Sequence, residues 1–512
     1  MRRKLVIGIV PLVLLCVLSM ACSKGGDPAK MIPEDAAVVV VIPNLGNTTG
    51  HIGEFVDWLA QQVPMMAMMK QSMTAAAGVD LTKAESLAEK GLNPKGGAAF
   101  AALDIGSKKM VIMIPVKDED AFVGFINETL KKQGGPEITK EGDNYTFPGG
   151  GGVMTITKGF ALVSDNADNF SAVTGGGNKL ADNENYQLLC KNLGTSNDLL
   201  VYVSSNVLAT APIPEAQQMA ALAKDIKTIG GALDISSKEL TIKIFAGMAD
   251  MENIKKIMAS SGEGSLIESL PGPAPVLAKA NLSVPDLWGY IKTKIATDPA
   301  TKMDLENGMS EMKTATGVDV EANIIANIAG NPSVAYYGMT GRRNKIPDLV
   351  ITMTVKDEAK IRDSLSKIAD AMSGGKKKKG ALSEMGVIEL STGPREKMYA
   401  AVVKGSLIVT MDDDRMKQIL GMLAGTSSDQ TALASVSLES AKSALKDDKS
   451  TIVYISAYEL IKVIREGLSK NKQAQLDAYM AQVGGVANSH VIITVTPQDE
   501  GVLKEISIQF GQ

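Results

Sequence analysis

The chain has 512 residues, of which 45% are hydrophobic and 21% are charged, and its formal net charge is −4 at pH 7. This balance excludes overall disorder and gives little support to a general nucleic-acid-binding role. The chain has 2 His, 3 Cys and only 4% aromatic residues, which argues against a disulfide scaffold, a zinc cluster and a haem site. We therefore predict no metal site and no cofactor.

The first residues have the pattern of an export signal. Three cations, at positions 2–4, precede the apolar run Leu5–Leu18, which is too short to span a membrane comfortably. The small residues Ser19 and Ala21 then lead to Cys22. Residues 1–21 resemble a bacterial lipoprotein signal, which implies that Cys22 becomes acylated and anchors the chain in a membrane. Several acyl chains together give stable anchoring.

The resemblance has one departure and one further implication. Leu18 lies four residues before Cys22, where such signals normally place Leu three residues before. The family's sorting rule reads Ser23, in place of Asp, as favouring the outer membrane. Two alternatives are an ordinary secretory signal cleaved near Ala21 and an uncleaved anchor. In the processed chain Cys190 is the only remaining free thiol, which we interpret as a buried small hydrophobe.

Short segments of the chain recur in the same order, with an offset that grows from 239 to 252 residues. The matching pairs are Gly78–Asp80 with Gly317–Asp319, Val116–Glu119 with Val355–Glu358, and Val201–Ser204 with Val453–Ser456. Such repetition predicts a duplication. The predicted division is a signal peptide 1–21, a tether 22–32, a first repeat 33–259, a Pro-rich linker 260–275 and a second repeat 276–512.

Each repeat is predicted to have an α+β fold, with a mainly antiparallel sheet covered on one side by helices. A long helical region is expected over 50–77 and over 284–316. Asp118 and Asp357 are placed to cap the helices that follow them. The alternation of apolar residues in Glu239–Ile244 is typical of a half-buried antiparallel strand.

Residues 63–73 contain five Met, and Met65, Met69 and Met73 recur at every fourth position, so they share one face of a helix. One hypothesis is a pliable hydrophobic surface for a lipid, a partner helix or a soft metal, which could take the form of an apolar groove under the sheet lined by these side chains. The interpretation we favour is a helix that packs on its sheet, with Met filling gaps.

Three other groups are candidate sites by composition alone. Lys376–Lys379 is a cationic run that suits anionic headgroups, although a solvated loop is the simpler interpretation. Asp412–Asp414 lacks the spacing of a calcium loop and better fits a helix N-terminus. His51 and His490 are far apart in the sequence and no Gly-x-Ser-x-Gly elbow is present, so we predict no catalytic residue and no enzyme activity.

Residues 32–40, Ile-Pro-Glu-Asp-Ala-Ala-Val-Val-Val, together with Val116–Asp118, resemble uncharacterised bacterial envelope lipoproteins with a duplicated α+β domain of unknown function. That resemblance implies an envelope location and carries no reaction or catalytic residue with it. The first functional hypothesis is a non-enzymatic interaction or structural module, with the membrane and an envelope protein or lipid as partners. The alternative is a carrier or sensor of an apolar ligand, and the weakest is a hydrolase.

Overall fold

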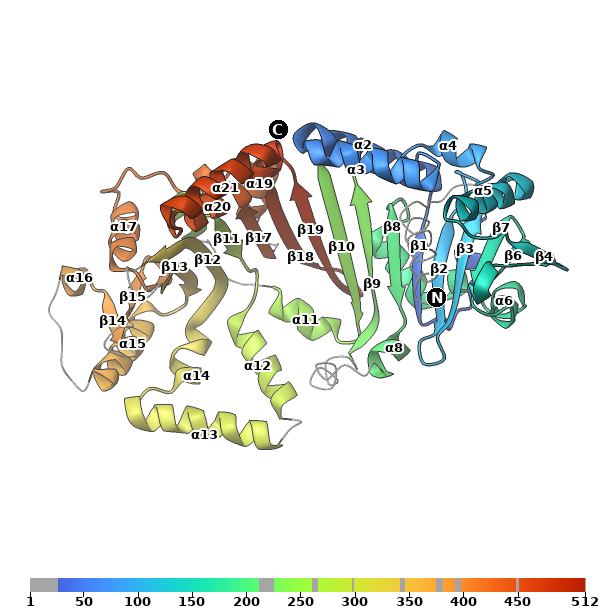
Figure 1. Ribbon diagram of the computed structural model, residues 1–512. Coiled ribbons are helices and arrows are strands. Elements are labelled where there is room, and N and C mark those ends of the chain that lie inside the picture. Colours follow the sequence, from blue (N-terminus) through green and yellow to red (C-terminus); the bar gives the residue numbers. More distant parts are fainter. Residues whose placement is uncertain are drawn as a thin grey trace. The chain divides into compact units, whose positions relative to one another are not determined.

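The computed structural model describes residues 26–210, 225–259, 266–296, 299–340, 346–373, 381–391, 397–447 and 451–511. They form an α+β structure of antiparallel strands and many helices, which divides into two compact units (Figure 1). The first unit contains the described residues up to Ala249, with Gln482–Gly484 and Glu500–Gln509. The second contains Asp250–Ala481, Gly485–Asp499 and the residues from Phe510 onward.

The first unit is built on an antiparallel sheet. Its strands are β1 (Val38–Ile42), β2 (Ala98–Asp104), β3 (Lys109–Pro115), β4 (Thr139–Glu141), β5 (Asn144–Thr146), β6 (Val153–Thr157), β7 (Phe160–Ser164), β8 (Leu199–Val203), β9 (Ile226–Ile235), β10 (Glu239–Met248) and β19 (Gly501–Gln509). The order across the sheet is β4-β5-β6-β7-β3-β2-β1-β8-β9-β10-β19. The strand that pairs with β10 in this sheet therefore comes from the far end of the sequence.

The helices of the first unit cover both faces of its sheet. They are η1 (Pro28–Lys30), α2 (Leu45–Gln62), α3 (Pro64–Ala77), α4 (Ala84–Glu89), α5 (Glu119–Lys132), η2 (Pro148–Gly150), α6 (Asp168–Thr174), η3 (Leu180–Asp182), α7 (Glu184–Leu193) and α8 (Ser205–Thr210). On β3, Val111 and Met113 join a core with α6 and α7, whereas Ile114 joins a second core with α5. Because strand side chains alternate between faces, both faces are buried. The expectation of helices on one side only was wrong.

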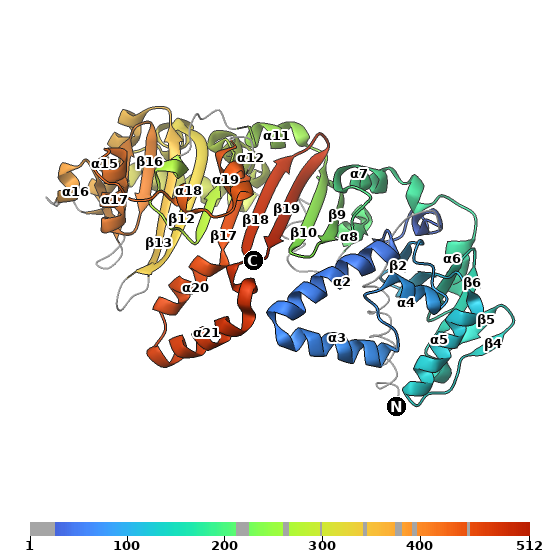
Figure 2. The same cartoon turned by 90° about the horizontal axis from the view of Figure 1, so that it is seen from above.

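The helical region expected over 50–77 consists of two helices. α2 ends at Gln62 and α3 begins at Pro64, whose ring nitrogen has no hydrogen to donate to the preceding turn. Figures 1 and 2 show α3 turning back from the end of α2, and the two helices contact each other. The region 284–316 is likewise divided, into α12 (Val284–Ile295) and α13 (Pro299–Thr316).

The second unit has a sheet of the same kind. Its strands are β11 (Val276–Lys279), β12 (Ile328–Thr340), β13 (Ile346–Val355), β14 (Ile388–Ser391), β15 (Lys397–Val403), β16 (Ser406–Thr410), β17 (Thr451–Ser456) and β18 (His490–Pro497). They lie in the order β14-β15-β16-β13-β12-β11-β17-β18 and all pairs are antiparallel. Taken in chain order, this arrangement matches β5-β6-β7-β3-β2-β1-β8-β9 of the first unit, strand for strand.

Helices again cover both faces of the second sheet. Besides α12 and α13 they are α11 (Met251–Ile257), η4 (Leu266–Ser269), α14 (Val320–Asn323), η5 (Ile325–Asn327), α15 (Glu358–Met372), α16 (Ala381–Glu384), α17 (Asp413–Leu423), α18 (Ala432–Ser435), α19 (Glu439–Lys446), α20 (Ala457–Glu466), α21 (Lys470–Val483) and η6 (Gly484–Asn488). One core joins β13 and β16 to α17 and α19, and the other joins β15 to α15.

The predicted helix caps are present. The Asp118 carboxylate accepts the backbone N–H of Ala121 at 3.0 Å, and the Asp357 carboxylate accepts that of Lys360 at 2.9 Å. These side chains satisfy donors that the first turns of α5 and α15 leave without an intrahelical partner.

Two segments outside the predicted repeats are part of the folded units. Within the predicted linker, residues 260–265 lie outside the described residues, whereas Leu270 and Ala274 are buried in the core of the second unit. The predicted tether is shorter than expected, because Ala29 and Ile32 are buried in the first unit. Burial of these apolar side chains in the core removes them from water, which stabilises the folded unit.

Candidate functional site

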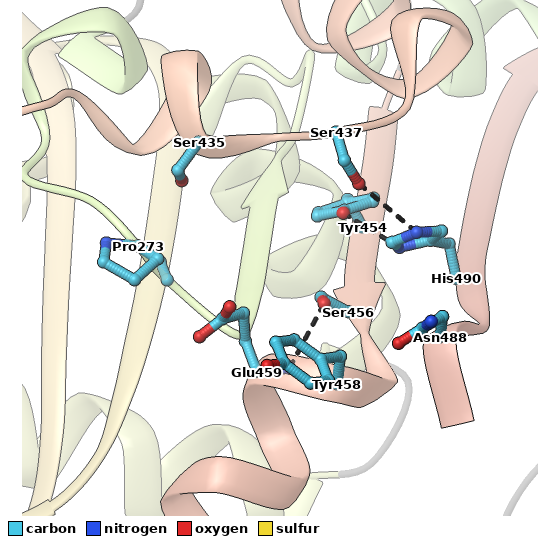
Figure 3. A pocket seen from close by; sticks show the side chains of 10 residues that line it. Pro273, Ser435, Ser437, Tyr454, Ser456, Tyr458, Glu459, Asn488 and His490 are labelled. Carbon is cyan, nitrogen blue, oxygen red and sulfur yellow. Dashed lines mark hydrogen bonds between the residues drawn. The ribbon is translucent and has the colours of Figure 1, made fainter. Parts of the chain in front are cut away.

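A cavity of about 200 Å³ opens on the surface of the second unit (Figure 3). Most of its lining side chains are polar. They are Pro273, Ala274, Ser435, Ser437, Tyr454, Ser456, Tyr458, Glu459, Asn488 and His490. Most of them come from three elements: the end of β17 with the start of α20, the start of β18, and the segment between α18 and α19.

Strand geometry brings the polar side chains of this cavity together. Tyr454 and Ser456 are two residues apart on β17, so they lie on one face of the sheet. His490 begins β18 directly opposite Ser456. Its ring stacks on that of Tyr454 at a centroid distance of 5.7 Å, with 3.0 Å between His490 Nδ1 and the Tyr454 hydroxyl. Ser437 Oγ lies 3.3 Å from His490 Nε2, which completes a Ser–His–Tyr chain (Figure 3).

The His490 and Tyr454 side chains are uncharged near neutral pH. Burial lowers the pKa of His490 and raises that of Tyr454. A neutral imidazole can exchange a proton with Ser437, but hydrolytic triads place a carboxylate on the second imidazole nitrogen to stabilise the imidazolium. Here that partner is a phenol, and the Glu459 carboxylate is paired with Lys462 at 3.0 Å. The arrangement suits hydrogen bonding to a small polar molecule better than nucleophilic catalysis.

No short motif signals this cavity, because Ser437, Tyr454 and His490 are separated by 17 and 36 residues. The Tyr-x-Ser spacing within a predicted strand is the one available hint, since it places two hydroxyls on one face. Sequence reasoning treats His490 only as half of a pair with His51, and the two residues belong to different units. His51 instead lies 2.9 Å from the buried Asp198 carboxylate in the first unit.

A second cavity, of about 430 Å³, lies between α11 and α12. Its walls carry both Lys256 and Lys294 and the carboxylates of Asp250 and Asp286. Asp250 caps α11 by accepting the backbone N–H of Asn253, and Asp286 accepts a hydrogen bond from the side chain of Ser283. Both acids are therefore engaged in helix starts, and the cavity has no single sign of charge with which to select a ligand.

The structure places the predicted methionine site on an exposed helix face and not under the sheet. Met65, Met69 and Met73 lie on α3 with exposed fractions of 60%, 45% and 45%. They do not fill gaps against the sheet, and they line neither of the two cavities described above. Only Ala77 of α3 is buried. The helix contacts α2, and its methionines face solvent, because the break at Pro64 turns α3 back along α2.

The family of the chain is shown by a match over most of its length. Residues 56–376 match the family described as a protein of unknown function (DUF3352). The chain belongs to this family.

Beyond the DUF3352 family, parts of the fold are similar to crystal structures of TP0453. Crystal form I has a TM-score of 0.25 at 12% sequence identity, covering 44% of this chain and 81% of that one. Crystal form IV has a TM-score of 0.26 at 14% identity, covering 46% and 88%. Crystal form III has a TM-score of 0.26 at 12% identity, covering 47% and 91%. No curated protein matches the chain.

The remaining candidate positions that were predicted from the sequence of this DUF3352 chain can be compared with the structure. Cys22 and Lys376–Lys379 lie outside the described residues. The carboxylates of Asp412–Asp414 gather within 4.8 Å of one another, with Asp412 capping α17 and the other two paired with Lys417. The expectation of a helix N-terminus there is confirmed. Across the described ranges, no helix combines the length and the hydropathy needed to cross a membrane.

Proposed function

We propose that this chain is a lipid-anchored protein of the bacterial cell envelope, held by acyl chains on Cys22 and acting as a non-enzymatic interaction or structural module. The supporting observation is where the folded protein begins. Pro28 and Ala29 are already buried, six and seven residues after Cys22. A chain processed at Cys22 would therefore leave only a few residues between its lipid and its first packed side chain.

The module itself is proposed to be an internal repeat. The strand orders of the two units correspond over eight strands, and β1 and β11 take equivalent central places between their neighbours. Asp118 and Asp357, which belong to matching sequence segments, cap equivalent helices. Two similar surfaces on one anchored chain would bind a partner at two points when that partner also has two similar parts.

The location is proposed as the outer membrane, on the basis of Ser23 after the acylated residue. The alternative of a carrier with a methionine-lined groove has less support, because Met65, Met69 and Met73 are exposed on α3. The hydrolase alternative has less support as well, because among the described residues the partners of the His490 ring are the Ser437 and Tyr454 hydroxyls and not a carboxylate.

The test is intact mass spectrometry of the full-length protein purified from its own membrane in mild detergent. A mass increase that matches acylation, localised to Cys22, is the expected result. The Cys22→Ala variant should lack that increase and should no longer sediment with membranes. Cys190→Ala is the matched control, because it also removes one thiol and should keep both properties. An unmodified Cys22 in the wild-type protein would rule out the proposed anchor.

Density separation of the two membranes tests the location, and chemical cross-linking before solubilisation tests the interaction role. A partner polypeptide recovered in fixed ratio would support the module. A lipid recovered in fixed ratio with no polypeptide would instead favour the carrier.

A further inference from the structure

The helix α3 presents one long uncharged face to solvent. Met65 and Met68 are 60% and 66% exposed, and Met69 and Met73 are each 45% exposed. At 100° per residue these four side chains fall within one sector of the helix surface. The only other side chains in that sector are Ser72 and Ala76, and both are exposed as well. The Ser72 hydroxyl donates to the Met69 carbonyl at 3.0 Å, so its hydrogen is already bonded within the helix.

The charge of α3 lies away from this methionine face. Lys70 is the only charged residue of the helix, and its ammonium group is paired with the Asp57 carboxylate of α2. Contiguous exposed apolar side chains on a folded protein mark a site of contact with another protein or with a membrane. Methionine side chains are flexible and polarisable, so they conform to an irregular or fluid partner.

The path of the chain between Cys22 and α2 favours the membrane over a protein partner. Pro28 packs against Gly97, where an added Cβ would lie 2.9 Å from Pro28 Cδ. The neighbouring Gly96 carbonyl accepts the backbone N–H of Leu45, the first residue of α2. The chain therefore enters the first unit at the end of the sheet where α2 begins, and Ala77 at the end of α3 packs in the same core as Leu45.

This entry point is close to the proposed anchor. Six residues, fully extended, span at most about 20 Å, so a membrane that holds Cys22 lies within about 20 Å of Pro28. That distance is less than the length of α2, which is about 27 Å for 18 residues. A bilayer is thus the one large apolar partner that the proposed anchor brings to this helix pair.

We propose that the methionine face of α3 lies on the lipid bilayer to which the chain is anchored, an inference that rests on the acylation of Cys22 proposed above. The helix would lie in the plane of the membrane, with Met65, Met68, Met69 and Met73 between the headgroups and the acyl chains. The acyl group supplies the attachment, and the methionine face fixes which side of the first unit meets the membrane.

The helix α13 also carries exposed methionines but lacks this property. On α13, Met303 and Met312 are nine residues apart and so point to opposite sides of the helix. Asp304, Glu306 and Glu311 lie among them. Carboxylates resist transfer to an anionic bilayer, so α13 offers no comparable surface.

The experiment places a reporter on the face. Full-length acylated protein carrying Cys190→Ala and Met69→Cys is labelled with an environment-sensitive fluorophore and reconstituted in vesicles of phosphatidylethanolamine and phosphatidylglycerol. Ile105→Cys is the matched control, because Ile105 is 52% exposed and follows β2 at the end opposite Gly97. We expect a blue-shifted emission at position 69, quenched several-fold by lipids with doxyl groups in their acyl chains, and neither effect at position 105.

The outcomes separate this inference from the anchor. Protein that floats with the vesicles while its label at position 69 stays solvated and unquenched overturns the inference and leaves the anchor intact. A blue shift without quenching by doxyl lipids also overturns it, because a second copy or another protein then covers the face. Protein that fails to float overturns the anchor itself.

A second measurement avoids any effect of the fluorophore. In the Cys22→Ser chain, residual flotation depends on the face alone. Changing Met65, Met69 and Met73 together to Gln should lower that flotation about tenfold, whereas Ile105→Gln should leave it unchanged. Equal flotation of both variants counts against the inference, and an unaltered melting temperature shows that the exposed substitutions leave the fold intact.

Discussion

Asp348 and Arg415 form an ion pair within the second unit, with 2.8 Å between Asp348 Oδ2 and Arg415 Nη2. Both side chains are largely buried. The guanidinium carbon also lies 3.7 Å from the centroid of the Tyr337 ring, and the Tyr337 hydroxyl donates to the Pro271 carbonyl at 2.8 Å. One cation thus joins β12, β13 and the first turn of α17.

Removing this cation should destabilise the protein. Arg415→Met leaves the Asp348 carboxylate largely buried without its partner, and we expect the free energy of unfolding to fall by about 3 kcal/mol. Urea unfolding followed by circular dichroism measures the loss. Adding Asp348→Asn to Arg415→Met should restore part of it, because the unpaired charge is then gone. If the double variant is as unstable as the sum of the single variants, the two charges are not coupled.

Two glycines in the first unit should respond oppositely to the same substitution. A Cβ at Gly230 would lie 2.3 Å from the Val201 carbonyl oxygen across the β8–β9 pair, so Gly230→Ala should destabilise the protein by about 2 kcal/mol or more. Gly124 is inside α5 with no atom near its missing Cβ. Gly124→Ala should stabilise the protein by about 0.5 to 1 kcal/mol. Thermal unfolding of both variants gives the comparison, and a shift of the same sign in both would contradict the packing described here.

Stability should fall in mild acid because of His490. Burial lowers the pKa of this imidazole below its ordinary value of 6.5, so the unfolded chain binds a proton at a pH where the folded chain does not. The stabilisation that comes from the neutral His490 is fully present above about pH 6.5, and it is lost as the pH falls toward the pKa of the folded state. The His490→Gln variant should lose less stability than the wild type between about pH 7 and pH 5. Melting temperatures across that range test this, and parallel curves would refute it.

Cys190 should react slowly in the folded protein. Burial raises the pKa of its thiol, and the thiolate is the reactive form. Alkylation by iodoacetamide at neutral pH should be at least about tenfold slower in the native chain than in urea. Mass spectrometry at timed intervals measures both rates, and an additional alkylated residue in the native chain would reveal a free thiol at Cys22. Equal native and unfolded rates would mean that Cys190 is open to solvent.

Local structure was predictable where local chemistry decides it. The caps Asp118, Asp357 and Asp412 are short side chains next to the helix they begin, so sequence spacing is enough to place them. Alternation predicted the antiparallel strands for the same reason. Which faces of the sheet are covered by helices could not be predicted. Val111 and Ile114 point to opposite faces and both are apolar, but the sequence pattern does not say which helix packs on either residue.

Features that depend on contacts between distant parts of the chain could not be predicted from the sequence. The His490 cavity needs two strands and a loop to meet. The methionine repeat predicts a helix face but not whether protein, lipid or water covers it, because all three interpretations use the same spacing. The strand β19 pairs with β10 although β11 to β18 lie between them in the chain, and no short-range pattern signals this pairing.

The place of β19 has a consequence for how the protein is made. β10 ends at Met248 and its sheet neighbour β19 begins at Gly501, about 250 residues later. At about 5 to 20 residues per second, a ribosome needs about 10 to 50 s to cover that distance. During this time the backbone of β10 is an open template for wrong pairing. We therefore expect the nascent chain to depend on a chaperone that covers this edge until the final strand arrives.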